Sequence, residues 1–176
     1  MESILISAEQ LKTLTSISNT LDVDLLQPHL LISQQLYVQP VLGDALYNDI
    51  VNRYDNNTIT GDTLVLYDEY IVPAIAYSAW FSAAPFLAYK TNRSGIQTQG
   101  SPDNVAVNPE ELSLYIARVE HLMNFYNSRM QKYLDDNYTK FPLYRSADSQ
   151  EVSKGGGIYL GYKSLRGCNN DNYGWQ

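Results

Sequence analysis

The chain has 176 residues, a length that most often folds as one domain with its own core. Its formal net charge of −7 argues against a protein that grips nucleic-acid phosphates over its whole surface. The single cysteine, Cys168, excludes an internal disulfide framework, and the first ten residues lack a signal-peptide pattern, so we expect a cytoplasmic protein. The sequence also has 15 tyrosines, whose apolar ring and polar tip suit half-buried contacts such as subunit interfaces.

Charge and composition change near residue 137. Residues 1–136 carry 7 bases and 16 acids, whereas residues 137–176 carry 5 bases and 3 acids and are rich in glycine, asparagine and tyrosine. We therefore expect an all-α domain over residues 1–137, a bundle of about five helices, and an extended C-terminal tail over residues 138–176.

Capping signals mark the first three helices in chain order. Ser7 and Gln10 form a capping box for the first helix. Asp22 or Asp24 is expected to cap the second, with Pro28 in its first turn and Pro40 and Gly43 at its end. The third helix is expected to begin after a cap at Asp44 and the fourth after a cap at Asp62.

The fourth helix contains twenty residues without a charge, 70–89. A membrane span has that length, but two prolines, interior aromatic residues and many alanines and serines favour a buried central helix. Pro73 and Pro85 predict kinks or a break in this helix.

A loop or short hairpin is expected over residues 91–108, where "IQTQG" and "VAV" could pair as brief strands. Asn108 and Pro109 then begin a fifth helix. This helix carries an apolar seam with heptad spacing, which predicts one antiparallel partner, the fourth helix. The seam consists of Leu112, Ile116, Val119, Met123, Tyr126, Met130 and Tyr133. A second line through Leu122, Phe125 and Leu134 is expected to widen the same apolar face.

The second helix has no charged side chain between Asp24 and Asp44. A five-helix bundle seldom encloses two such helices, so we expect another subunit to cover its spare faces. Glutamines can satisfy hydrogen bonds there without burying a charge. The predicted interface residues are Gln27, Gln34, Gln35, Tyr37 and Gln39. The alternative is a monomer whose glutamine stripe faces water.

Catalytic chemistry has little support in the sequence. His29 and His121 each stand alone on a helix without a partner at ligand spacing, and Cys168 lies in the tail. The carboxylate pairs fall at helix ends or on solvated faces. We expect no catalytic residue, no metal site and no cofactor.

Two stretches, "LISAEQLKTLTSI" and "LDVDLLQPHLLISQQLYVQPVLGDALYNDI", resemble the head–tail connector, or adaptor, family of tailed bacteriophages. They are most similar to the neck ring proteins of crAss-like phages. The resemblance covers about residues 4–54 and consists of a short capped helix, an acidic turn and a helix that ends at Leu-Gly. The residues that fill this pattern are Glu9, Leu11, Lys12, Asp22, Asp24, Leu26, Ile32, Gln35, Val41, Leu42, Gly43, Leu46 and Tyr47.

The resemblance implies a structural virion protein. Such adaptors form homo-oligomeric rings, commonly dodecameric, that dock on the portal, extend the DNA channel without specific DNA binding and carry further neck or tail proteins. The implied location is the virion neck, assembled in the host cytoplasm, with no membrane partner. The implied portal-docking residues are Tyr159, Leu160, Tyr162, Lys163, Leu165, Arg166, Tyr173 and Trp175.

Three other classes remain open. A cytoplasmic helical binding module would hold a peptide or ligand in a groove between the two long helices. A small membrane protein would use residues 70–89 as its span. An enzyme is the least supported class, because no catalytic constellation is present in the sequence.

Overall fold

The computed structural model describes residues 3–92, 95–98 and 108–144. Over these residues the chain is an all-α bundle with one short hairpin, as predicted. Five continuous helices form it, and two of them contain a π-helical turn. They are α1 (Ala8–Leu14), α2–η1–α3 (Val23–Ser33, Gln34–Val38, Gln39–Leu42), α4 (Asp44–Asp55), α5–η2–α6 (Gly61–Leu66, Tyr67–Ile71, Val72–Ala88) and α7 (Pro109–Asp136).

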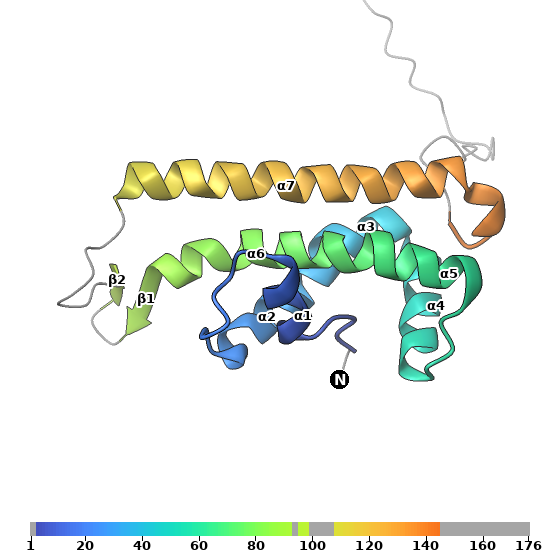
Figure 1. Ribbon diagram of the computed structural model, residues 1–176, viewed down its shortest axis with the longest axis horizontal. Helices are drawn as coiled ribbons and strands as arrows, with labels where there is room; N and C mark the ends of the chain where they lie inside the picture. The colour runs from blue at the N-terminus through green and yellow to red at the C-terminus, as the bar shows by residue number, and fades with distance from the viewer. Residues whose placement is uncertain (1–2, 93–94, 99–107, 145–176) are drawn as a thin grey trace, which may run out of the picture.

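The helices pack in layers around α6 (Figure 1). α7 runs antiparallel to α5–α6 along one side, while α1 and α2 pack on the other side of α6. Consequently Ala74, Ile75, Ala76, Ser78 and Ala79 of α6 are completely buried. The helix Gly61–Ala88 is long and apolar enough to cross a membrane by composition, but 56% of its most apolar window is buried by the protein itself. The fold therefore accounts for this apolar run as a central helix.

Most of the predicted helix ends are confirmed. Ser7 and Gln10 form the capping box, Asp22 accepts a hydrogen bond from the Asp24 amide, and Asn108 caps α7. Two capping predictions are wrong. Asp44 is the first residue of α4, which follows Gly43 at a φ of 74°. Asp62 lies inside the first turn of α5, which begins at Gly61.

The prolines act differently from one another. η1 ends two residues before Pro40, and η2 ends two residues before Pro73. A proline has no amide hydrogen and its ring crowds the preceding turn, so a wider turn accommodates it without breaking the helix. Pro85 is held inside α6, which continues to Ala88, so the predicted break does not occur there. Pro28 lies in the sixth position of α2, beyond the first turn where it was expected.

The hairpin between the long helices pairs β1 (Tyr89–Asn92) with β2 (Gly95–Thr98) in antiparallel register, with Tyr89 opposite Thr98. The partner of the "IQT" segment is therefore Tyr89–Asn92. The segment that was predicted to pair with it, residues 105–107, lies outside the described residues.

Aromatic pairs hold α7 against η2 and α6. Tyr70 stacks on Tyr133 with ring centroids 4.0 Å apart, and Tyr77 stacks on Tyr126 at 4.3 Å. The indole nitrogen of Trp80 donates to the hydroxyl of Tyr115 at 3.0 Å. This seam confirms the predicted antiparallel pairing of the two long helices. It also shows that several tyrosines pack within the chain itself.

The packed region extends beyond the predicted domain boundary at residue 137. After the short helix η3 (Tyr138–Lys140), both Phe141 and Tyr144 are buried against the core. The Tyr144 hydroxyl donates to an Asp135 carboxylate oxygen at 2.7 Å. Residues 138–144 therefore belong to the helical body, and the rest of the predicted tail lies outside the described residues.

Candidate interaction surfaces

Gln34 is part of the core, so its assignment to a subunit interface is wrong. Its side chain is completely buried. The amide oxygen accepts from the backbone amide of Leu5 at 2.9 Å, and the amide nitrogen donates to the Ser3 carbonyl and the Tyr47 hydroxyl at 2.8 and 2.6 Å. Gln34 therefore anchors the chain segment that precedes α1. The periodicity of the sequence did not indicate this role.

The other four predicted interface residues lie nearer the surface. Gln27 and Gln35 are exposed. Tyr37 is half-buried and meets the ring of Phe81 edge-on, with centroids 6.3 Å apart. Gln39 is half-buried and its amide donates to Asp44 at 2.9 Å. Gln27 lines the groove next to Tyr54, and the exposed surface of this helix has an apolar centre elsewhere.

That centre, which we call the α2 face, consists of Leu25, Ile32 and Leu36. Their exposed fractions are 51%, 40% and 62%. Phe86, at the C-terminal end of α6, is 66% exposed and packs on His29 beside this face. Three large apolar side chains along one helix form a surface that water solvates poorly. The spacing of seven and four residues between them is the signal in the sequence that marks this face.

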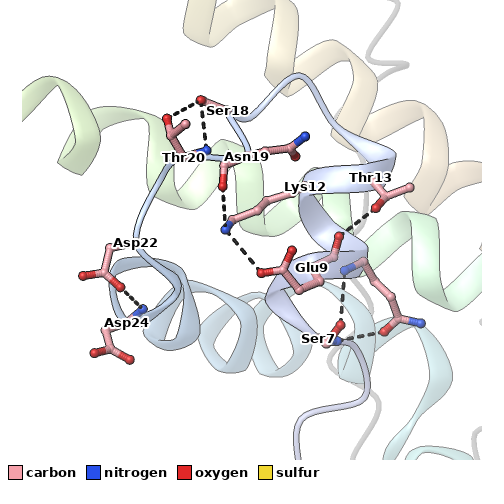
Figure 2. Close-up of polar contacts among 10 residues, drawn as sticks. Ser7, Glu9, Lys12, Thr13, Ser18, Asn19, Thr20, Asp22 and Asp24 are labelled. Atoms are coloured by element: carbon pink, nitrogen blue, oxygen red, sulfur yellow. Dashed lines mark hydrogen bonds and ion pairs between the residues drawn. The ribbon is translucent and has the colours of Figure 1, made fainter.

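The α2 face has acidic ends. No lysine or arginine occurs between Val23 and Leu42, while Asp22 and Asp24 at one end and Asp44 at the other are exposed. Figure 2 shows the region around Asp22 and Asp24, with Lys12 directed toward Glu9 and Asn19.

Lys12 has a structural role in the turn before α2. Its ammonium group donates to the Asn19 carbonyl at 3.2 Å and lies 3.4 Å from a Glu9 oxygen, and its side chain is only 4% exposed. In the described part of the chain, no ion pair therefore involves Asp22 or Asp24. The negative potential at this end of the α2 face remains available to a partner.

A second surface, the α7 face, lies on the side of α7 that points away from α6. Its apolar residues are Leu114, Leu122 and Phe125, with exposed fractions of 66%, 36% and 55%. The prediction that Leu122 and Phe125 widen the inner seam is wrong; of that line only Leu134 is buried. The heptad positions occupy the contact with α6, which leaves this second line outside it.

Basic residues accompany the apolar side chains of the α7 face. Arg118, Arg129 and Lys132 fall on the same side of the helix and are exposed. None of the three forms an ion pair with another described residue. Arg129 lies over the Tyr70 ring, 4.8 Å from its centroid. Glu120 is the acid within this stretch, and it lines a groove on another side of α7.

That groove lies where the end of α6 meets the start of α7. It is open to solvent, has a volume of about 370 Å³ and includes Pro85, Leu112, Ile116 and Glu120 in its wall. A second open groove of about 290 Å³ lies between the N-terminal segment, α2 and Tyr54. Neither is an enclosed pocket that would bury most of a small ligand.

The two described histidines differ in their surroundings. His29 is buried, its Nδ1 lies 2.9 Å from the Ser82 hydroxyl, and burial lowers its pKa below the usual value, so the ring is neutral at pH 7. His121 is exposed on α7. Among residues 3–92, 95–98 and 108–144, no three His, Cys, Asp or Glu side chains gather in the manner of a metal site.

Residue Cys168 and the predicted portal-docking residues lie outside the described part of the chain. The latter are Tyr159, Leu160, Tyr162, Lys163, Leu165, Arg166, Tyr173 and Trp175.

A family of unknown function, DUF6712, matches residues 38–154, which is more than half of the chain. The protein belongs to the DUF6712 family. The matched region includes the whole α7 face and both long helices of the central seam, whereas α1 and α2 precede it. Comparison with curated proteins and with solved structures gave no match.

Proposed function

We propose that this DUF6712 protein is a structural component of a phage neck. In this proposal it forms a homo-oligomeric ring, dodecameric by analogy with adaptors, that docks on the portal, extends the DNA channel and carries further neck or tail proteins. The supporting resemblance lies in residues 4–54, which form α1, the α2–η1–α3 helix and α4. The protein acts as a scaffold without a catalytic step.

The observation that carries the proposal is the presence of two separate apolar surfaces on one protomer. The α2 face and the α7 face belong to helices that pack on opposite sides of α6 (Figure 1). Large exposed apolar surfaces on a soluble protein are usually covered by another protein. Two different surfaces on each copy suit a head-to-tail contact, and such contacts close into rings when the rotation allows it.

The acidic charge of the chain fits a channel wall. DNA phosphates are repelled by carboxylates, so an acidic inner wall lets the duplex slide instead of holding it. The C-terminal segment after Tyr144 would then supply the contacts with the portal, using its aromatic, leucine and basic residues. These roles concern partners, and each can be tested with purified components.

Assembly state provides the direct test. The purified full-length protein should form rings, or oligomers able to close into rings, in mass photometry and negative-stain images, either alone or after addition of the portal protein of the same particle. A protein that remains strictly monomeric under both conditions would rule out the ring. Deletion of residues 145–176 should weaken portal binding while the cooperative thermal unfolding of the helical body is retained.

The groove between α6 and α7 favours a second candidate, a binding module for a peptide. Pro85, Leu112 and Ile116 provide an apolar wall and Glu120 one charge. This candidate predicts a monomer that gains a peptide ligand in the groove. Glu120 is exposed in the groove wall, so Glu120→Lys should then weaken peptide binding, whereas in the neck proposal the same change should leave ring formation intact.

A further inference from the structure

The ring of the proposed function needs a subunit contact, and the two faces are complementary. We propose that the α7 face of one copy docks on the α2 face of the next copy. The inference rests on the proposed function, because it identifies the surfaces through which a ring would close.

The apolar parts of the two faces have the same length. Leu25 and Leu36 are eleven positions apart, as are Leu114 and Phe125. At 1.5 Å of rise per residue, each apolar line extends about 16 Å along its helix. Each line also has a middle residue, Ile32 on one and Leu122 on the other, so the two can interdigitate as helices do in a bundle.

The charges of the two faces are opposite in sign. The α2 face is bordered by the exposed carboxylates of Asp24 and Asp44 and has no base. The α7 face carries Arg118, Arg129 and Lys132, and the ion pairs of the described residues involve none of them. Docking the two faces would bring together acids and bases that form no ion pair among the described residues, which steers the encounter and selects the correct orientation.

The same charges disfavour symmetric pairing. Two α2 faces together would place carboxylates against carboxylates, and two α7 faces would place cations against cations. A contact between unlike faces avoids both repulsions. It also leaves one α2 face and one α7 face free on every pair, so the next copy can add until the ring closes.

Two double variants test the pairing. In the first, Ile32→Asp with Leu36→Asp disables the α2 face and leaves the α7 face intact. In the second, Leu122→Asp with Phe125→Asp disables the α7 face and leaves the α2 face intact. All four residues are exposed, so the variants should keep the wild-type helical circular dichroism. Leu64→Asp, on α5 and 41% exposed in the wild type, is the matched control outside both faces.

The expected result is specific to unlike faces. Each double variant alone should be monomeric by mass photometry, and the Leu64→Asp control should assemble like the wild type. An equimolar mixture of the two double variants should form a one-to-one dimer and stop there, because only one functional pair of faces remains. A variant that still dimerises with itself would overturn the proposal, since that result requires a symmetric contact.

The failures of the two proposals can be told apart. If the wild type forms rings but the mixture gives no dimer, this pairing is wrong and the neck proposal stands. If the wild type stays monomeric alone and with the portal, and the mixture stays monomeric too, both are wrong. In a third outcome, the mixture gives no dimer and the first variant retards a DNA duplex of about 30 base pairs in a gel-shift assay. That result would overturn the pairing and assign the α7 face to nucleic acid.

Charge exchange supplies a second test that leaves the apolar residues untouched. Arg118→Glu with Lys132→Glu should abolish assembly, as should Asp24→Lys with Asp44→Lys. Combining all four changes in one chain should restore assembly, because the α7 face then carries acids and the α2 face bases, and faces of opposite charge meet again. Failure of the combined variant to assemble, with its fold retained, would contradict the proposed orientation.

Discussion

The side chain of Gln34 connects three parts of the N-terminal half. Its amide joins the backbone at Ser3 and Leu5 to the hydroxyl of Tyr47 on α4. Tyr67 adds a second tie, because its hydroxyl donates to the Leu5 carbonyl, and burial raises the pKa of that phenol, which keeps it protonated as a donor. The segment before α1 is therefore held by polar contacts buried inside the protein.

Replacing Gln34 should destabilise the fold. Gln34→Leu leaves the Leu5 amide and the Ser3 carbonyl without their partner, and we expect a loss of about 2–4 kcal/mol in the free energy of unfolding. Chemical denaturation monitored by circular dichroism measures it. Gln27→Leu is the control, since Gln27 is exposed on the same helix, and it should change stability by less than about 0.5 kcal/mol. Equal losses in the two variants would contradict the buried role of Gln34.

At the scale of elements, stacked tyrosines set the register of α7 on the continuous helix α5–η2–α6. Tyr70 and Tyr77 are seven residues apart on that helix, and their partners Tyr133 and Tyr126 are seven apart on α7. This matched spacing is what two antiparallel helices need to repeat the same contact after two turns. The buried residues Val119, Met123, Met130 and Leu134 lie along the same side of α7.

A double-mutant cycle can measure one of these stacks. Tyr77→Leu, Tyr126→Leu and the double variant keep apolar bulk but remove the stacked rings, and we expect a coupling of about 0.5–1.5 kcal/mol. The same cycle with Tyr138 in place of Tyr126 should give no coupling, because Tyr138 is 62% exposed and far along the chain from the stack. A coupling near zero for Tyr77 and Tyr126 would show that ring stacking does not select the register.

At the scale of the whole molecule, residues 138–144 close one end of the bundle. Phe141 is 3% exposed and contacts the ring of Tyr133, while the exposed ion pair of Lys140 with Asp62 joins this segment to the start of α5. The ion pair itself contributes little in water. The buried aromatic rings are therefore the main attachment of the segment to the bundle.

Phe141→Ala should consequently lower the free energy of unfolding by about 3–5 kcal/mol, because it leaves a cavity under the end of α7. Thermal and chemical denaturation of the full-length protein measure the change. The control Leu143→Ala removes a neighbouring side chain that is 43% exposed and should cost about 1 kcal/mol or less. A small effect of Phe141→Ala would place the end of the packed body at residue 137, where the sequence alone predicted it.

The features that the sequence predicted correctly are local ones. The capping box at Ser7, the cap at Asn108 and the heptad seam of α7 depend on residues within two turns of one another, so their physics is contained in short stretches. The same reasoning identified the helical class, the five helices and the antiparallel pairing of the two longest.

Which apolar and polar side chains are buried and which are exposed was decided by the tertiary structure. Residues 25–42 carry no formal charge on any side of the helix, so their sequence does not say which side meets α6, and the π-turn at Gln34–Val38 shifts the phase of the helix midway. Packing placed Gln34 in the core and left Leu25, Ile32 and Leu36 exposed. Likewise, α7 has two apolar lines, and α6 is its main neighbour, so the position of α6 largely determined which line was covered.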